Sequence, residues 1–157
     1  MKLSEILSPD CIRLDVDATS KKRVLELASQ LLAGTDESLS PRGVFDCLIA
    51  REKLGSTGLG HGVAIPHGRL PGLDRTIGVF LRTQKGVDFD APDKESVDLF
   101  FALLVPEEST EEHLQVLASI ASYFGSGRSR NALRVDISPQ EARELLCHVD
   151  SQEFQAS

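Results

Sequence analysis

Tryptophan is absent from this chain of 157 residues, which also contains a single tyrosine and no basic run longer than the three residues 21–23. Its formal net charge is -7 at pH 7, and its sequence pI is about 5.1. A protein of this sign repels the phosphates of a nucleic acid, and so few aromatic rings give no platform on which bases could stack. The composition therefore argues against nucleic acid as a partner.

Cysteine is scarce, and long apolar runs are lacking. The three cysteines, Cys11, Cys47 and Cys147, are scattered and form no C-x-x-C pair, which predicts reduced thiols rather than a disulfide framework. No apolar run approaches the roughly 20 residues that span a bilayer. Residues 1–10 have neither the basic start nor the apolar stretch of a secretory signal. We expect a cytoplasmic protein without membrane insertion.

Cations are concentrated in one part of this acidic chain. Residues 51–75 carry four cations against two anions, a net charge of +2, which leaves -9 for the rest of the total of -7. The cations are Arg51, Lys53, Arg69 and Arg75, and the anions are Glu52 and Asp74. A local excess of cations in an acidic protein favours a site for a small anionic ligand or group.

Apolar spacing and capping residues predict helices that alternate with strands. The predicted helices are 21–33, 41–54, 109–124 and 138–146, the predicted strands are 63–65, 76–82 and 97–105, and residues 55–62 form a loop. Serines at positions 20, 40, 109 and 138 can cap the four helices. This alternation predicts one α/β (α+β) domain over residues 1–150, with a mixed β-sheet flanked by helices on both faces, and a frayed tail at 151–157.

Glycines cluster in the predicted loop 55–62, whose sequence is GSTGLGHG. Successive backbone N–H groups in such a loop can form an anion-binding nest, although a tight structural connection would show the same composition. No Gly-Lys-Ser/Thr follows, as a Walker A loop requires, and the spacing does not fit a dinucleotide fingerprint. The loop alone leaves both interpretations open.

His67 follows the predicted strand 63–65 and stands between Pro66 and Gly68. These neighbours restrict the backbone and leave room above the imidazole ring. A neutral imidazole can act as a nucleophile on phosphorus once a hydrogen bond fixes its tautomer. The alternative is a loop histidine bonded only to the backbone.

His113 and Arg51 are further candidates for an anion site. His113 lies in the first turn of the predicted helix 109–124, and Arg51 lies in the last turn of the predicted helix 41–54. Either could face a phosphoryl group. Alternatively, His113 is an ordinary surface histidine and Arg51 compensates the helix dipole. His61 with His113 could suggest a metal site. No carboxylate or thiolate stands at a familiar ligand spacing, so we expect no metal and no other cofactor.

The stretch from Arg51 to Gly68, REKLGSTGLGHGVAIPHG, closely resembles the signature of enzyme IIA proteins of the mannitol/fructose type in the bacterial phosphotransferase system. The segment LGSTG, and a chain that reads as a free-standing domain without transporter parts, most resemble the nitrogen-regulatory branch. A looser resemblance extends from Leu3 to about Leu146. It implies a mixed β-sheet flanked by helices, in agreement with the pattern of elements above.

The resemblance also implies roles for single residues. His67 would be phosphorylated on Nε2, with His113 and Arg51 supporting the phosphoryl group from either side. The residues that frame the pocket would be Ser56, Thr57, Gly58, Gly60 and Gly62. His61 stands where a small polar residue is expected, which leaves its effect on His67 open.

The implied donor is the histidine phosphocarrier protein of the nitrogen branch. The phosphorylation state would then regulate target proteins such as potassium transport systems, sensor kinases or metabolic regulators. This describes a phosphotransferase system component with a phosphohistidine intermediate rather than an independent metabolite enzyme.

Three other functions compete with this one. A sugar-specific enzyme IIA would pass the phosphoryl group to a fructose or mannitol permease. A binding regulator would never be phosphorylated, although the joint presence of Arg51, His67 and His113 argues against it. A metal-dependent hydrolase would contain stoichiometric zinc.

Overall fold

The computed structural model describes residues 2–108 and 111–150. The helical elements in chain order are α1 (Leu3–Ile6), the 3-10 turn η1 (Pro9–Cys11), α2 (Lys21–Ala33), α3 (Pro41–Glu52), α4 (Glu111–Phe124), α5 (Gly127–Arg134) and α6 (Pro139–Leu146). The strands are β1 (Ile12–Val16), β2 (Gly58–Gly60), β3 (Val63–Ala64), β4 (His67–Leu70), β5 (Ile77–Val87) and β6 (Val97–Pro106).

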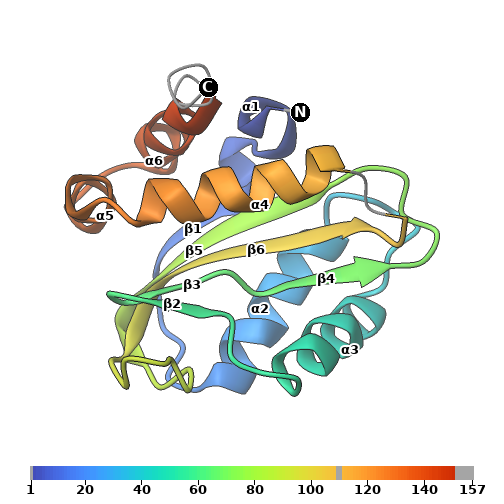
Figure 1. Ribbon diagram of the computed structural model, residues 1–157, viewed down its shortest axis with the longest axis horizontal. Coiled ribbons are helices and arrows are strands. Elements are labelled where there is room, and N and C mark those ends of the chain that lie inside the picture. The colour runs from blue at the N-terminus through green and yellow to red at the C-terminus, as the bar shows by residue number, and fades with distance from the viewer. Residues whose placement is uncertain (1, 109–110, 151–157) are drawn as a thin grey trace.

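Strand β6 is the centre of the sheet. The strand order is β1-β5-β6-β3-β2, and β4 pairs with β6 on the same side as β3 (Figure 1). β6 is antiparallel to β5 and parallel to β3 and β4, so the sheet is mixed. Within this register, Leu103 of β6 pairs with Gly78 of β5 on one side and with His67 of β4 on the other. The sheet therefore brings the start of β4 and the start of β5 to the same level of β6.

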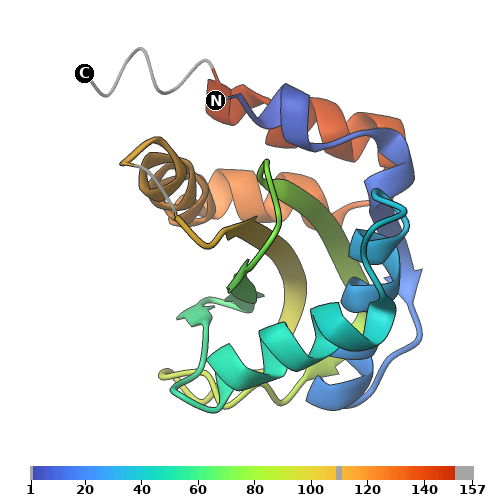
Figure 2. The same cartoon turned by 90° about the vertical axis from the view of Figure 1, so that its right-hand side faces the viewer.

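Helices cover both faces of the sheet. Figure 2 shows α3, in cyan, on one side of the curved sheet and α4, seen nearly end-on, on the other. The ring of Phe124 in α4 lies 6.4 Å from that of Phe80 in β5 and 6.5 Å from that of Phe101 in β6. On the opposite face, Leu25 of α2 and Leu48 of α3 are fully buried. Each such side chain contributes about 1.5–3 kcal/mol on leaving water, and the predicted fold class is confirmed.

Serine hydroxyls begin three of the helices as predicted. Ser20, Ser40 and Ser138 each accept a hydrogen bond from the backbone N–H three residues later, and such a cap contributes about 1 kcal/mol. The predicted cap at Ser109 and the predicted frayed tail at 151–157 lie outside the described residues. In the part of the chain that the structure describes, no helix has the length and apolar character needed to cross a membrane.

The sequence pattern misses six elements: the short helical elements α1 and η1, the strands β1, β2 and β4, and the helix α5. β2 falls inside the predicted glycine loop, because Gly58 and Gly60 pair with the neighbouring strand β3. β5 continues to Val87, beyond the predicted end at residue 82. The difference with a functional consequence is β4, because His67 is its first residue and not part of a loop.

Candidate functional site

A backbone carbonyl fixes the orientation of the His67 imidazole. The ring atom Nδ1 lies 2.8 Å from the carbonyl oxygen of Ile65, two residues earlier. A carbonyl oxygen can only accept a hydrogen bond, so Nδ1 must carry the proton. The other ring nitrogen, Nε2, is then unprotonated in the neutral imidazole and keeps the lone pair that a nucleophile needs.

His67 is half-buried and lines an open depression of about 650 Å³ between β4 and the C-terminal half of α3. Arg51 and Cys47 of α3 and Arg69 of β4 line the same depression. Two arginines therefore line the depression together with His67, and Asp46 adds one carboxylate to the same lining. Both arginines suit an anion, because a guanidinium binds phosphate through two parallel N–H donors.

Gly68 allows α3 to approach β4 closely enough to form this depression. A Cβ atom at Gly68 would lie 2.6 Å from the sulfur of Cys47, closer than packed atoms tolerate. Cys47 stands one helical turn before Arg51, so the close approach also brings the guanidinium to the level of His67. Glycine is therefore required at position 68 for α3 to pack this closely against β4.

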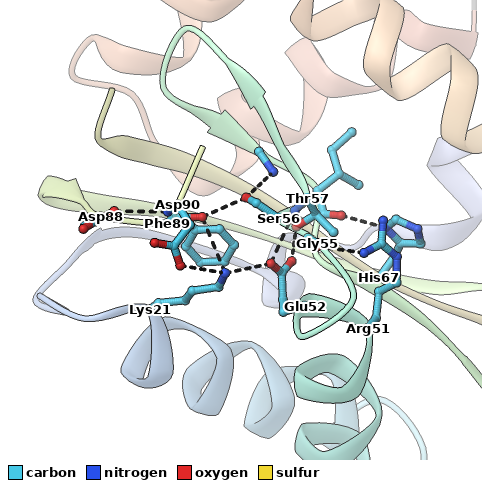
Figure 3. Close-up of polar contacts among 12 residues, drawn as sticks. Lys21, Arg51, Glu52, Gly55, Ser56, Thr57, His67, Asp88, Phe89 and Asp90 are labelled. Atoms are coloured by element: carbon cyan, nitrogen blue, oxygen red, sulfur yellow. Dashed lines mark hydrogen bonds and ion pairs between the residues drawn. The ribbon is translucent and has the colours of Figure 1, made fainter. Parts of the chain in front are cut away.

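Arg51 is held in place by the chain that follows its own helix. Its Nη1 atom donates a hydrogen bond of 2.8 Å to the carbonyl of Gly55, just beyond the end of α3. Figure 3 shows the Arg51 side chain beside the ring of His67. The bond to Gly55 restricts the guanidinium, whose other N–H donors are still available. Arg51 and His67 therefore lie in one depression, as the sequence predicted.

His113 occupies a different position, on the opposite side of β6. Its ring is buried in the first turn of α4, and its Nδ1 atom is hydrogen-bonded to the hydroxyl of buried Thr76. Thr76 directly precedes Ile77, which pairs with Leu104 of β6. His113 is not among the described residues that line the depression of His67. It faces the same end of β6 from the side of β5.

In the glycine-rich segment, residues 55–62, the polar side chains form hydrogen bonds on the side that faces away from the depression. The Ser56 hydroxyl donates to the carbonyl of Phe89 at 2.8 Å, and the Thr57 hydroxyl donates to the Glu52 carboxylate. None of the predicted framing residues Ser56, Thr57, Gly58, Gly60 and Gly62 is among the described residues that line the depression. The segment contacts the site through its backbone, as the bond from Arg51 to Gly55 illustrates.

His61 lies apart from His67, in the positive-φ region at 56°. Its N–H donates to the carboxylate of Asp93 at 2.9 Å, and its carbonyl accepts from Arg134 at 2.8 Å. The N–H of His61 holds the pKa of the Asp93 carboxyl below its ordinary value. Exposed His61 lines a separate depression with Asp93 and Arg134. None of these contacts, all of them among residues that the structure describes, reaches His67.

A buried ion pair that no sequence pattern indicated lies behind the site. The carboxylate of Glu52, whose side chain is only 1% exposed, lies 2.9 Å from the ammonium group of Lys21 in the first turn of α2. That ammonium also lies 4.7 Å from the centre of the Phe89 ring. Figure 3 shows Glu52 between Lys21 and Thr57. In the sequence, Lys21 and Glu52 look like ordinary surface residues of two helices.

Among residues 2–108 and 111–150, no three His, Cys, Asp or Glu side chains are placed to hold a metal ion. The predicted cation cluster is divided in space. Arg51 and Arg69 belong to the depression of His67, whereas Arg75 donates to the carbonyl of Thr35 at 3.4 Å and lines a different cavity. Two of the four cations of this region therefore line the depression of His67, together with Asp46.

Residues 5–149 match the family described as phosphoenolpyruvate-dependent sugar phosphotransferase system, EIIA 2. The chain belongs to this family. The match covers nearly all of the described residues, from α1 to the end of α6. The family predicted from residues 51–68 is confirmed.

Relatives within the family indicate a branch. A nitrogen regulatory protein from Pseudomonas aeruginosa is 46% identical over 134 residues, which cover 85% of this chain and 87% of that protein. The crystal structure of nitrogen regulatory protein IIA-Ntr from Neisseria meningitidis is 50% identical, with a TM-score of 0.87 over 92% of this chain and 98% of that chain. The crystal structure of IIA mannitol from Escherichia coli is 27% identical, with a TM-score of 0.74 over 89% and 98%. The predicted similarity to the nitrogen-regulatory branch is confirmed.

Proposed function

We propose that this chain is a phosphoryl-carrying regulatory protein of a nitrogen phosphotransferase system and that Nε2 of His67 is the phosphoryl acceptor. The observation that carries the proposal is the hydrogen bond between Nδ1 of His67 and the Ile65 carbonyl, which leaves Nε2 unprotonated in a depression shared with Arg51. Similarity to nitrogen regulatory proteins supports the regulatory role. The chain would act in the cytoplasm, where phosphoenolpyruvate-derived phosphoryl groups are available.

The transfer step balances without a cofactor or a proton acceptor. The lone pair of His67 Nε2 forms a new P–N bond to the phosphorus of a donor phosphohistidine whose other ring nitrogen is protonated. The donor's P–N bond breaks, its nitrogen keeps that electron pair, and the donor leaves as a neutral imidazole. The proton on His67 Nδ1 stays in place, hydrogen-bonded to the Ile65 carbonyl. Bond making and breaking are similar on the two imidazoles, so positioning and charge stabilisation dominate the catalysis.

Two side chains are suited to stabilise the transferred group. Arg51 can direct its free guanidinium edge at the phosphoryl oxygens while Gly55 holds the other edge. Neutral His113 can donate from Nε2–H when its Nδ1 accepts the hydroxyl proton of Thr76, and the hydrogen bond between them permits this tautomer. His113 would then support the group from the side opposite to Arg51.

The site is suited to a protein donor rather than a small phosphate ester. The depression is open, and Leu54 at its rim is 84% exposed. Leu114, next to His113, is 53% exposed. These two exposed leucines, one lining the depression of His67 and one next to His113, favour docking of a partner surface. A histidine phosphocarrier protein of the nitrogen branch is the donor that this family implies, and the added charge of about -1.5 to -2 would change which targets bind.

Intact-protein mass spectrometry tests the proposal. The protein is incubated with phosphoenolpyruvate, nitrogen-branch enzyme I and nitrogen-branch phosphocarrier protein. His67→Ala is tested alongside, with the control His148→Ala, which changes an exposed histidine just beyond the end of α6. We expect one acid-labile phosphoryl adduct on the wild type and on His148→Ala, and none on His67→Ala. An adduct on His67→Ala, or none on the wild type with a charged donor, would contradict the proposal. Onward transfer to a permease domain would instead favour a sugar-specific role.

A further inference from the structure

Thr57 connects two parts of the site that are separated in the sequence. Its hydroxyl donates to one oxygen of the Glu52 carboxylate, and its N–H donates to the other at 3.3 Å. Its carbonyl accepts the N–H of Ile65 at 3.0 Å. The carbonyl of the same Ile65 residue accepts Nδ1–H of His67. A continuous series of hydrogen bonds therefore joins Glu52, through Thr57 and Ile65, to the imidazole.

The same carboxylate also controls the segment that holds Arg51. Glu52 is the last residue of α3 and the neighbour of Arg51, and its bonds to Thr57 fold residues 53–57 back over the end of the helix. This turn places the Gly55 carbonyl where it accepts from Arg51. The imidazole and the guanidinium thus depend on one buried anchor.

Lys21 completes the anchor from another helix. Its ammonium group lies 2.9 Å from Glu52 and 3.5 Å from the carboxylate of Asp90, and it lies over the ring of Phe89. The carbonyl of Phe89 also accepts from Ser56 at 2.8 Å, beside Thr57. Figure 3 shows these groups as one network on the side of the segment that faces away from His67.

We propose that Thr57 and Glu52, with Lys21 behind them, are positioning residues that align the His67 imidazole and the Arg51 guanidinium for phosphoryl transfer. The inference rests on the proposed function. Neither side chain touches the depression in which the phosphoryl group would lie, so both act through Ile65 and Gly55. Removing either side chain should change the orientation of the imidazole and the guanidinium, although both groups are still present in the variant.

Thr57→Val tests the inference, because valine keeps the shape of the buried side chain and removes only the hydroxyl. Thr57→Ser restores the hydroxyl. Thr83→Val is the matched control: it removes another buried threonine hydroxyl, which donates to the Lys85 carbonyl at the far end of β5. We expect Thr57→Val to slow phosphoryl labelling at saturating donor by roughly 10- to 100-fold, with little change in the donor concentration at half-maximal rate. Thr57→Ser and Thr83→Val should label at nearly the wild-type rate.

Two further readouts separate positioning from a general loss of structure. Heteronuclear NMR of the His67 imidazole reports which ring nitrogen carries the proton, and Thr57→Val should lower the population protonated at Nδ1 whereas Thr83→Val should not. In an Arg51→Ala background, Thr57→Val should slow labelling by a smaller factor than in the wild type, because part of its effect passes through Arg51.

The outcomes distinguish failure of this inference from failure of the proposed function. If the wild type is never labelled on His67, the proposed function fails. If the wild type is labelled and Thr57→Val is labelled equally fast with an unchanged His67 tautomer, the positioning role is overturned. If Thr57→Val and Thr83→Val slow labelling equally, the effect is one of stability and the inference is likewise overturned.

Discussion

Replacing Lys21 by methionine removes the cation paired with a buried carboxylate. The Glu52 side chain is 1% exposed, and the Lys21 side chain is 20% exposed. Methionine keeps most of the length of the lysine side chain but cannot pair with the carboxylate. Loss of one partner from a buried ion pair costs about 3–5 kcal/mol, because the other charge is left without compensation. Since Lys21 retains some contact with water, we expect about 2–4 kcal/mol here.

This loss corresponds to a large shift in thermal stability. In a domain of this size each kcal/mol lowers the melting temperature by about 2–4 °C, so Lys21→Met should melt roughly 4–16 °C below the wild type. Lys22→Met is the matched control, because Lys22 is the exposed neighbour in the same turn of α2. Its stability should stay within about 0.5 kcal/mol of the wild type.

A double variant identifies the origin of the effect. In Lys21→Met with Glu52→Gln, the amide oxygen can still accept from Thr57 and no buried charge remains. The double variant should therefore be more stable than Lys21→Met alone, measured by urea unfolding monitored by circular dichroism. Two results would refute the role of the buried ion pair. One is an equal free energy of unfolding for Lys21→Met and Lys22→Met. The other is a double variant that is less stable than Lys21→Met alone.

Three other predictions concern backbone conformation, pH and a thiol. Gly62 and Gly72 have similar positive φ values of +81° and +83°, but a Cβ at Gly62 would lie 2.9 Å from the Asp98 carboxylate, whereas a Cβ at Gly72 would have nothing within 4 Å. In urea unfolding, Gly62→Ala should therefore lose about 1–3 kcal/mol more stability than Gly72→Ala. Burial raises the pKa of Tyr123 from 10.0 to about 12, so the folded state holds this proton more tightly and stability should fall as pH rises from 10 to 12, by up to about 2–3 kcal/mol, but not in Tyr123→Phe. Burial raises the pKa of the Cys47 thiol, so iodoacetamide should modify this thiol slowly. The modified protein should no longer be phosphorylated at His67, whereas iodoacetamide-treated Cys47→Ser should be. Full phosphorylation of the modified protein would contradict the placement of Cys47 and His67 in one depression.

The sequence predicted the parts of the fold that depend on local patterns. The capped helices that became α2, α3 and α6 and the apolar strand β6 have signals within a single segment, namely a serine before an amphipathic run or a continuous apolar stretch. β4 and β2 have only 4 and 3 residues, and three of these seven are glycines. Such strands exist because β6 and β3 supply their hydrogen bonds, and no local pattern encodes that pairing.

Only part of the geometry of the candidate site could be anticipated from the sequence. Arg51 and His67 share one depression, as the sequence suggested, because Gly68 allows α3 to pack closely on β4. The expectation that loop side chains frame the phosphoryl group does not match their hydrogen bonds, since Ser56 and Thr57 are engaged with Phe89 and with a buried carboxylate. That arrangement depends on contacts among α2, α3 and the segment after β5, which sequence spacing cannot reveal.

The most direct test of the central claim is the position of the phosphoryl group on the protein itself. Protein with isotope-labelled histidine is phosphorylated through the nitrogen-branch donor, and phosphorus–nitrogen coupling is measured by NMR. The hydrogen bond between His67 Nδ1 and the Ile65 carbonyl predicts a single adduct on Nε2 of His67, with the proton retained on Nδ1. An adduct on Nδ1 of His67, or on His113, would contradict the account.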